Sequence, residues 1–158
     1  MQDGELNVVT GAFSYTGKYI AQRLLSIGKK VITLTNRVDR EDVFGHQVQA
    51  LSFNFDKPRK LADSLRGATT MYNTYWVRFP YGQVSFDKAV ENSKTLIKAA
   101  EESGIRRIVH ISITNPSEDS PLPLFQRESA RGKGYHPIKV ILRNNPTGCN
   151  LWAGGYSD

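Results

Sequence analysis

The chain has 158 residues, with 39% hydrophobic and 23% charged side chains, which is the size and composition of one folded domain and excludes a disordered chain. The net charge of +6 does not by itself indicate a nucleic-acid partner. No apolar run approaches the roughly 20 residues that cross a bilayer, and the single cysteine, Cys149, excludes an internal disulfide and forms no metal-ligand pattern, so we expect a cytoplasmic protein without a metal or a membrane partner.

Strand and helix patterns alternate along the chain. The apolar periodicity predicts a strand at 6–10, a helix at 15–27, strands at 31–35 and 48–53, a short helix at 58–65, a strand at 68–75, a long helix at 84–103 and a strand at 108–113. For the first helix we expect an inward face of Tyr19, Ile20, Leu24 and Ile27. For the long helix we expect an inward face of Val90, Leu96, Ile97 and Ala100.

This alternation predicts an α/β fold with a parallel sheet, because parallel strands need crossover helices. Right-handed crossovers place the first strand centrally, in the strand order 3-2-1-4-5 of a doubly wound, Rossmann-type domain. We assign residues 1–125 to this domain. Ligands of such sheets bind beyond the carboxyl ends of the strands, between the first and the fourth, so the site residues are expected there.

A glycine-rich turn lies where this fold would bind a phosphate. Residues 10–17 read T-G-A-F-S-Y-T-G and join the first strand to the first helix. Gly11 permits a tight turn, and Gly17 permits close packing of helix on strand. The N–H groups and the positive dipole end of the helix suit a pyrophosphate. Ser14 stands where a second glycine is usual and can itself donate to phosphate. The alternative is an ordinary strand–helix turn that contains two glycines.

The residues after the second strand bear on the choice of dinucleotide. Proteins that bind the ribose 2′-hydroxyl of NAD usually place an acidic residue here, but the chain reads Thr35-Asn36-Arg37 and has no acid before Asp39. Arg37 could pair with the 2′-phosphate of NADP. We therefore predict NADP, or otherwise NAD, as cofactor. The alternative for Arg37 is a solvated surface residue.

With these residues in place, the chain resembles the atypical short-chain dehydrogenase/reductase superfamily, close to its NmrA-like and NAD-dependent epimerase-like groups. The likeness is carried by V-T-G-A-F-S-Y-T-G (9–17), F-D (55–56), A-V-E-N-S-K-T-L-I-K-A-A (89–100) and G-I-R-R-I-V-H-I-S (104–112). It implies that Asp56 contacts the adenine, that 73–75 line the cofactor, and that Ser112 and Thr114 supply substrate-side hydroxyls. The candidate cofactor-binding residues are Gly11, Phe13, Ser14, Tyr15, Thr16, Gly17, Arg37, Asp56, Asn73, Thr74, Tyr75 and Asn92.

The catalytic pair that the resemblance implies is missing at its expected place. Reductases of this superfamily use Tyr-x-x-x-Lys, in which the lysine lowers the pKa of the tyrosine. Here Leu124 stands at the tyrosine position and Glu128 at the lysine position. Tyr135 and Lys139 match the motif by letter but lie in a charged, glycine-rich stretch. A non-catalytic, NAD(P)-sensing regulatory or scaffold module is therefore the alternative to an oxidoreductase or epimerase. The histidines show no convergent partners in the sequence: His46, His110 and His136.

The character of the chain changes after Phe125. Residues 126–158 lack periodicity, and reading their possible codons one base further on yields a continuation like that of the superfamily, in which the codon of Trp152 must give glycine. We therefore favour the hypothesis that this tail is an out-of-frame translation; the alternative is a short, divergent natural terminus. If the tail is an out-of-frame translation, we expect no sixth strand, an exposed edge beside the fifth strand, and an inactive fragment. The small-molecule substrate and the oligomeric state stay open.

Overall fold

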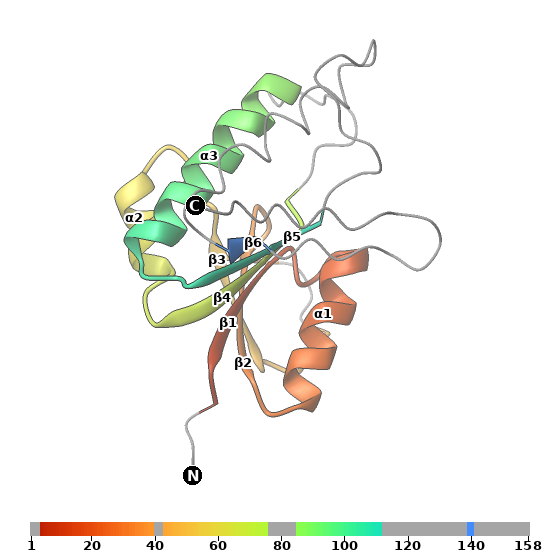
Figure 1. Cartoon of the computed structure of the whole chain (residues 1–158). Coiled ribbons are helices and arrows are strands. Elements are labelled where there is room, and N and C mark those ends of the chain that lie inside the picture. Colours follow the sequence, from red (N-terminus) through yellow and green to blue (C-terminus); the bar gives the residue numbers. More distant parts are fainter. Residues whose placement is uncertain (1–3, 40–42, 76–84, 112–138, 141–158) are drawn as a thin grey trace.

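The strands form one parallel sheet in the order β3-β2-β1-β4-β5-β6 (Figure 1). This computed structural model describes residues 4–39, 43–75, 85–111 and 139–140. The strands are β1 (Leu6–Thr10), β2 (Lys30–Thr35), β3 (Val48–Ser52), β4 (Ala68–Asn73), β5 (Arg107–His110) and β6 (Lys139–Val140). The helices are α1 (Tyr15–Ser26), α2 (Pro58–Ser64) and α3 (Phe86–Glu102). The predicted strand order 3-2-1-4-5 and the Rossmann-type fold are confirmed.

The strand β6 was not expected. It lies in the predicted irregular tail and pairs in parallel with β5, with Lys139 opposite Arg107 and Val140 opposite Ile108. The expectation that β5 has no neighbour on this side is therefore wrong along Arg107 and Ile108. The local signal was the run I-K-V-I-L at 138–142, whose β-branched residues favour a strand. The predicted domain boundary at residue 125 lies outside the described residues.

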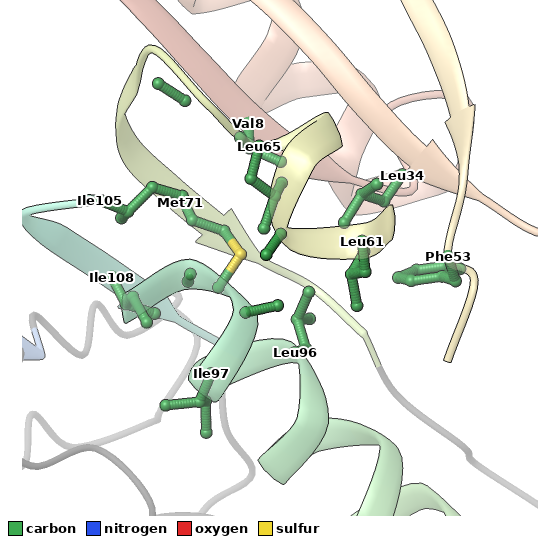
Figure 2. Close-up of a cluster of buried hydrophobic side chains, with 14 of the residues drawn as sticks. Val8, Leu34, Phe53, Leu61, Leu65, Met71, Leu96, Ile97, Ile105 and Ile108 are labelled. Atoms are coloured by element: carbon green, nitrogen blue, oxygen red, sulfur yellow. The ribbon is translucent and has the colours of Figure 1, made fainter. Parts of the chain in front are cut away.

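The central strands β1 and β2 are buried on both faces, which explains their mostly apolar sequences. Side chains alternate between the faces, so that Val8 and Val9 of β1 enter different clusters. Figure 1 shows α1 on one side of the sheet and α2 and α3 on the other. The larger cluster, shown in Figure 2, lies under α2 and α3 and includes Leu34, Leu61 and Met71.

The helix α1 buries a different stripe from the one its apolar residues suggest. Its buried residues are Gly17, Ala21 and Leu24. Tyr19 and Ile27, which we expected inside, are 60% and 50% exposed. Gly17 lies where α1 approaches the β1–α1 turn most closely, Ala21 and Leu24 continue the same buried stripe, and Tyr19 lies outside it. Of the four expected residues, Leu24 is buried and Ile20 is partly buried.

The helices on the other face follow their sequence signals. Pro58 opens α2, where its missing N–H leaves no helical bond unmade. Ser85 caps α3 by accepting a hydrogen bond from the Lys88 N–H at 3.1 Å. Gly104, at φ 87°, ends the same helix. The expected inward face of α3 is confirmed, because Val90, Leu96, Ile97 and Ala100 are all buried.

None of the helices in the described part of the chain has the length and apolar character of a membrane span.

Candidate functional site

The predicted site residues of the glycine turn and of the segment after β4 come together at the carboxyl ends of β1 and β4. These strands are neighbours in the sheet, with Val9 opposite Tyr72. The turn at 11–14 follows β1, and Thr74 follows β4. A Cβ atom on Gly11 would lie 3.6 Å from the Thr74 Oγ1 atom, so the two segments touch. This is the place where parallel α/β sheets bind ligands.

Hydrogen bonds from β2 hold the start of the glycine turn. Gly11 adopts φ 64°, a conformation that favours glycine, and its N–H donates to the Leu34 carbonyl at 2.8 Å. The Thr33 hydroxyl accepts from the Ala12 N–H at 2.9 Å and donates to the Val9 carbonyl at 2.7 Å. Thr33 is fully buried, so its hydroxyl depends on these partners. The position of the turn therefore depends on hydrogen bonds that involve both β1 and β2.

Gly17 brings α1 against this turn. A Cβ atom there would lie 2.1 Å from the Gly11 carbonyl oxygen and 3.0 Å from the Ala12 Cα atom. Only glycine fits such an approach of backbone to backbone. The first N–H groups of a helix have no partner within that helix, and its dipole makes this end positive. The first turn of α1 carries no acidic residue that would compete with an anion.

The side chains of Ser14 and Phe13 have partners within the protein. The Ser14 hydroxyl donates to the Gly11 carbonyl at 2.6 Å, and it makes no side-chain cap for α1. It must rotate before it can donate to a phosphate. The Phe13 side chain is buried and lies against Phe44, with ring centroids 6.0 Å apart. Only the backbone of Phe13 is therefore available to a ligand.

Tyr15 and Thr16 begin α1 and are exposed. The Tyr15 side chain is 83% exposed and meets the Tyr19 ring edge-on, with centroids 5.6 Å apart. Thr16 is available at the same end of the helix. Both side chains are therefore accessible at the helix end that adjoins the glycine turn.

Reciprocal hydrogen bonds join the end of β1 to the segment after β4. The Thr10 hydroxyl accepts from the Thr74 N–H at 2.6 Å, and the Thr74 hydroxyl donates to the Thr10 carbonyl at 2.5 Å. The Asn73 Oδ1 atom accepts from the Tyr75 N–H at 2.9 Å and from the Thr10 hydroxyl at 3.3 Å. Asn73 is fully buried. It is thus held by its neighbours rather than presented to solvent.

His110, which the sequence left without a partner, is part of this arrangement. It is the last residue of β5, is 2% exposed, and its Nδ1 atom lies 3.2 Å from the Asn73 Nδ2 atom. The expectation that it has no convergent partner is therefore wrong. The two residues are 37 positions apart and are opposed in the sheet register, a pairing that the local sequence does not encode. Their positions at the ends of adjacent predicted strands were the available signal.

Tyr75 and Asn92 contact each other. The Asn92 Nδ2 atom donates to the Tyr75 hydroxyl at 3.0 Å, which links α3 to the segment after β4. The Tyr75 ring also packs edge-on against Phe53 and Phe55, with ring centroids 5.3 Å apart in both pairs. Phe53 and Phe55 stack on each other at 4.9 Å. This aromatic cluster, which the sequence analysis did not single out, orients the Tyr75 ring in the segment after β4.

The other candidate residues stand apart from this arrangement. Arg37 follows β2 and is exposed, and its backbone N–H donates to the Thr35 hydroxyl at 3.1 Å. Asp56 follows β3 and is also exposed. Both lie beyond the carboxyl ends of their strands, which is the end of the parallel sheet that also holds the glycine turn. The proposed catalytic residues Ser112 and Thr114 lie outside the described residues, as does Tyr135 of the Tyr-x-x-x-Lys match.

The assembled residues can hold an anion at the helix end and position a planar or ribose-like group against the segment 73–75. Among residues 4–39, 43–75, 85–111 and 139–140, no three histidine, cysteine or acidic side chains gather as metal ligands would. The described chemistry is thus that of hydroxyls, amides and backbone N–H groups. Such groups bind and orient a ligand through hydrogen bonds.

Known proteins are similar to this chain in sequence or in fold. A family model described as the NAD dependent epimerase/dehydratase family matches residues 7–130. Sterol demethylase protein B of Methylococcus capsulatus is 30% identical over 109 residues, which are 66% of this chain and 33% of that protein. This chain therefore spans about a third of the length of that curated relative.

Solved structures show the same fold at low identity. Triphenylmethane reductase of a Citrobacter species is 18% identical with a TM-score of 0.72, over 86% of this chain and 47% of that one. Its complex with NADP(H) has a TM-score of 0.68. A short-chain dehydrogenase/reductase superfamily protein of Agrobacterium tumefaciens with bound NAD is 16% identical with a TM-score of 0.65, over 87% of this chain and 48% of that one. The chain spans about half of the length of each.

Proposed function

Because the chain belongs to the NAD dependent epimerase/dehydratase family, we propose that it binds a nicotinamide dinucleotide at the carboxyl ends of β1 and β4. The observation that carries the proposal is the contact of Gly17 with the Gly11 carbonyl, which brings the start of α1 onto the turn. The pyrophosphate would lie over this helix end, where N–H groups and the dipole attract it. Thr74 and Tyr75 would line the crevice, and Asp56 would lie beside the adenine.

We propose NADP(H) as the preferred dinucleotide. Arg37 is exposed and follows β2, and the segment from Thr35 to Arg37 contains no acidic residue. An always-charged guanidinium can bind the 2′-phosphate through two parallel hydrogen bonds. The structural neighbours include complexes with NADP(H) and with NAD, so they support the cofactor class and leave the choice to Arg37.

Calorimetric titration of the chain with NADPH and with NADH tests both proposals. We expect NADPH to bind at least about tenfold more tightly, the equivalent of one exposed charge-assisted contact. Arg37→Ala should remove that preference and leave NADH affinity unchanged. Arg66→Ala is the matched control, because Arg66 is also exposed and pairs with Asp63 rather than with the site. Absence of binding by either dinucleotide at millimolar concentration contradicts the proposed function.

We propose that this chain by itself performs no turnover. Leu124 and Glu128 stand where the resemblance implies a tyrosine and a lysine, and the chain spans only part of its relatives. Ser112 and Thr114, which follow β5 in the sequence, are our proposed substrate-side hydroxyls. The second candidate function, a non-catalytic dinucleotide sensor or scaffold, is favoured by the same missing tyrosine. NADPH oxidation with any of a panel of carbonyl substrates would contradict both statements.

A further inference from the structure

The orientation of the Asn73 amide is decided by its neighbours. The backbone N–H of Tyr75 can only donate, and it lies 2.9 Å from the Asn73 Oδ1 atom. That atom must therefore be the oxygen, because an amide nitrogen there would oppose donor to donor. The remaining atom, Nδ2, faces the His110 ring at 3.2 Å. The amide thus turns its oxygen toward the segment 74–75 and its NH₂ group toward β5.

The same reasoning assigns the protonation of the histidine ring. An amide NH₂ group donates and does not accept, so the His110 Nδ1 atom must be the acceptor. The ring is then neutral with its proton on Nε2. A protonated Nδ1 would oppose the NH₂ group in a buried location, where an unmade hydrogen bond is costly. One orientation of the Asn73 amide therefore satisfies both the His110 Nδ1 acceptor and the Tyr75 N–H donor.

These contacts form one polar chain across three neighbouring strands. It runs from His110 at the end of β5 to Asn73 at the end of β4, and then to Thr10 at the end of β1. Thr74 is attached to Thr10 by its N–H and by its hydroxyl. Thr10 directly precedes Gly11, so the chain ends at the glycine turn. A change at His110 can therefore alter the spacing between that turn and the segment after β4.

We propose that His110 is a positioning residue for the dinucleotide site and acts through the Asn73 amide. This inference rests on the proposed function, because it concerns the same dinucleotide site at the carboxyl ends of β1 and β4. His110 supplies an acceptor that keeps the Asn73 oxygen directed at the Tyr75 N–H and at the Thr10 hydroxyl. Without that acceptor, the buried NH₂ group loses its hydrogen bond to β5, and the Asn73 amide is held less firmly in this orientation. The hydrogen bond from the Tyr75 N–H to the Asn73 oxygen would then weaken, whereas Thr74 would keep its hydrogen bonds to Thr10.

Two substitutions separate positioning from packing. His110→Leu keeps a branched side chain of similar reach but removes the acceptor. His110→Asn places an oxygen two bonds from Cβ, as Nδ1 is in histidine, and so restores an acceptor at the same place. The control is His46→Asn, an exposed histidine at φ 66°, a conformation that asparagine tolerates.

The dissociation constant for NADPH is measured by calorimetry on protein shown to be folded by circular dichroism. We expect His110→Leu to weaken binding at least tenfold, His110→Asn to stay within about threefold of the wild type, and His46→Asn to match it. Equal affinity of His110→Leu and wild type overturns the inference. Equal losses in His110→Leu and His110→Asn also overturn it, because packing alone then explains the effect. If the wild-type chain binds no dinucleotide, the proposed function fails and this inference fails with it.

Nitrogen-15 NMR of the wild-type histidine rings provides a readout that does not depend on binding or on the folding of a variant. We expect the His110 ring to be neutral, with its proton on Nε2 and with Nδ1 unprotonated. A proton on Nδ1 would overturn the inference even where the affinities agree with it.

Discussion

The closest approach of backbone to backbone in the site makes Gly17→Ala a severe test of the geometry. The alanine Cβ atom would lie 2.1 Å from the Gly11 carbonyl oxygen and 2.6 Å from the Gly11 carbonyl carbon. Both neighbours are backbone atoms, so no side-chain rotation can relieve the overlap. To reach even a short contact, α1 must move away from the turn by about 1 Å.

Two opposing terms decide the sign of the stability change. Alanine is a better helix former than glycine by about 1 kcal/mol, which favours the variant. Overpacking a tight contact costs about 1–3 kcal/mol and occasionally more. Because the Gly11 carbonyl belongs to a turn held by β2, we expect the upper part of this range. The net expectation is a loss of about 1–2 kcal/mol in the free energy of unfolding.

Urea denaturation measures the stability, and calorimetric titration with NADPH measures the site. A shift of the denaturation midpoint without a change in slope would report lost stability of the same folded state. Since the movement takes the helix N-terminus away from the position proposed for the pyrophosphate, NADPH affinity should fall at least about tenfold, or 1.4 kcal/mol.

Gly67→Ala is the matched control. Gly67 lies at φ 82° with nothing within 4 Å of its Cβ position, so alanine there is strained but not crowded. It precedes Ala68, the first residue of β4, at the end of the sheet away from the crevice. We expect a stability loss of about 1–2 kcal/mol and unchanged NADPH affinity. A Gly17→Ala chain that is more stable than wild type, or that binds NADPH normally, would refute the reasoning.

Three further predictions concern stability. Glu5 accepts hydrogen bonds from Lys29 and Thr69, and both lower the pKa of its carboxyl group. Because the Glu5–Lys29 ion pair is about one-third exposed, Glu5→Gln should lower the free energy of unfolding by under about 1 kcal/mol at pH 7. That difference should disappear in urea melts as pH falls from the ordinary glutamate pKa, about 4.3, through the lowered folded-state pKa, and a difference that persists well below would contradict it. Thr33→Val leaves a buried N–H of the glycine turn without its acceptor and should cost about 1–3 kcal/mol by the same melts, whereas no loss would show that this bond is dispensable. Leu61→Ala, at a fully buried position, should cost about 2–5 kcal/mol, and a loss below 1 kcal/mol would mean that the core under α2 collapses to fill the space.

The order of the strands and the place of the site follow from the sequence because they depend on local patterns. Alternating β-branched and helical runs require crossovers, and crossovers of one hand place β1 at the centre. The turn at Gly11 and Gly17 is equally local, since its spacing is set within eight residues. Predicted bounds of the strands and helices accordingly agree with the structure to within a few residues.

The inward face of α1 was harder to predict because size and burial conflict there. Tyr19 and Ile27 are the apolar residues that periodicity selects, yet they face outward. The short distance between α1 and the turn at Gly17 leaves no room for a side chain there, and the stripe buried below it is that of Ala21 and Leu24. Interhelical and helix–strand distances are properties of the assembled fold, and hydrophobic spacing does not report them.

The partners within the site required the tertiary structure. His110 lies 37 residues from Asn73, and Asn92 lies 17 residues from Tyr75. Which side chains meet across parallel strands depends on their register, and a register shift of one residue would turn His110 to the other face of the sheet. The sequence by itself determined the fold class and the glycine turn through local periodicity and backbone freedom. Only the assembled sheet decided that His110, Asn73 and Thr10 share one buried chain of hydrogen bonds, because strand register brings distant polar groups within bonding distance.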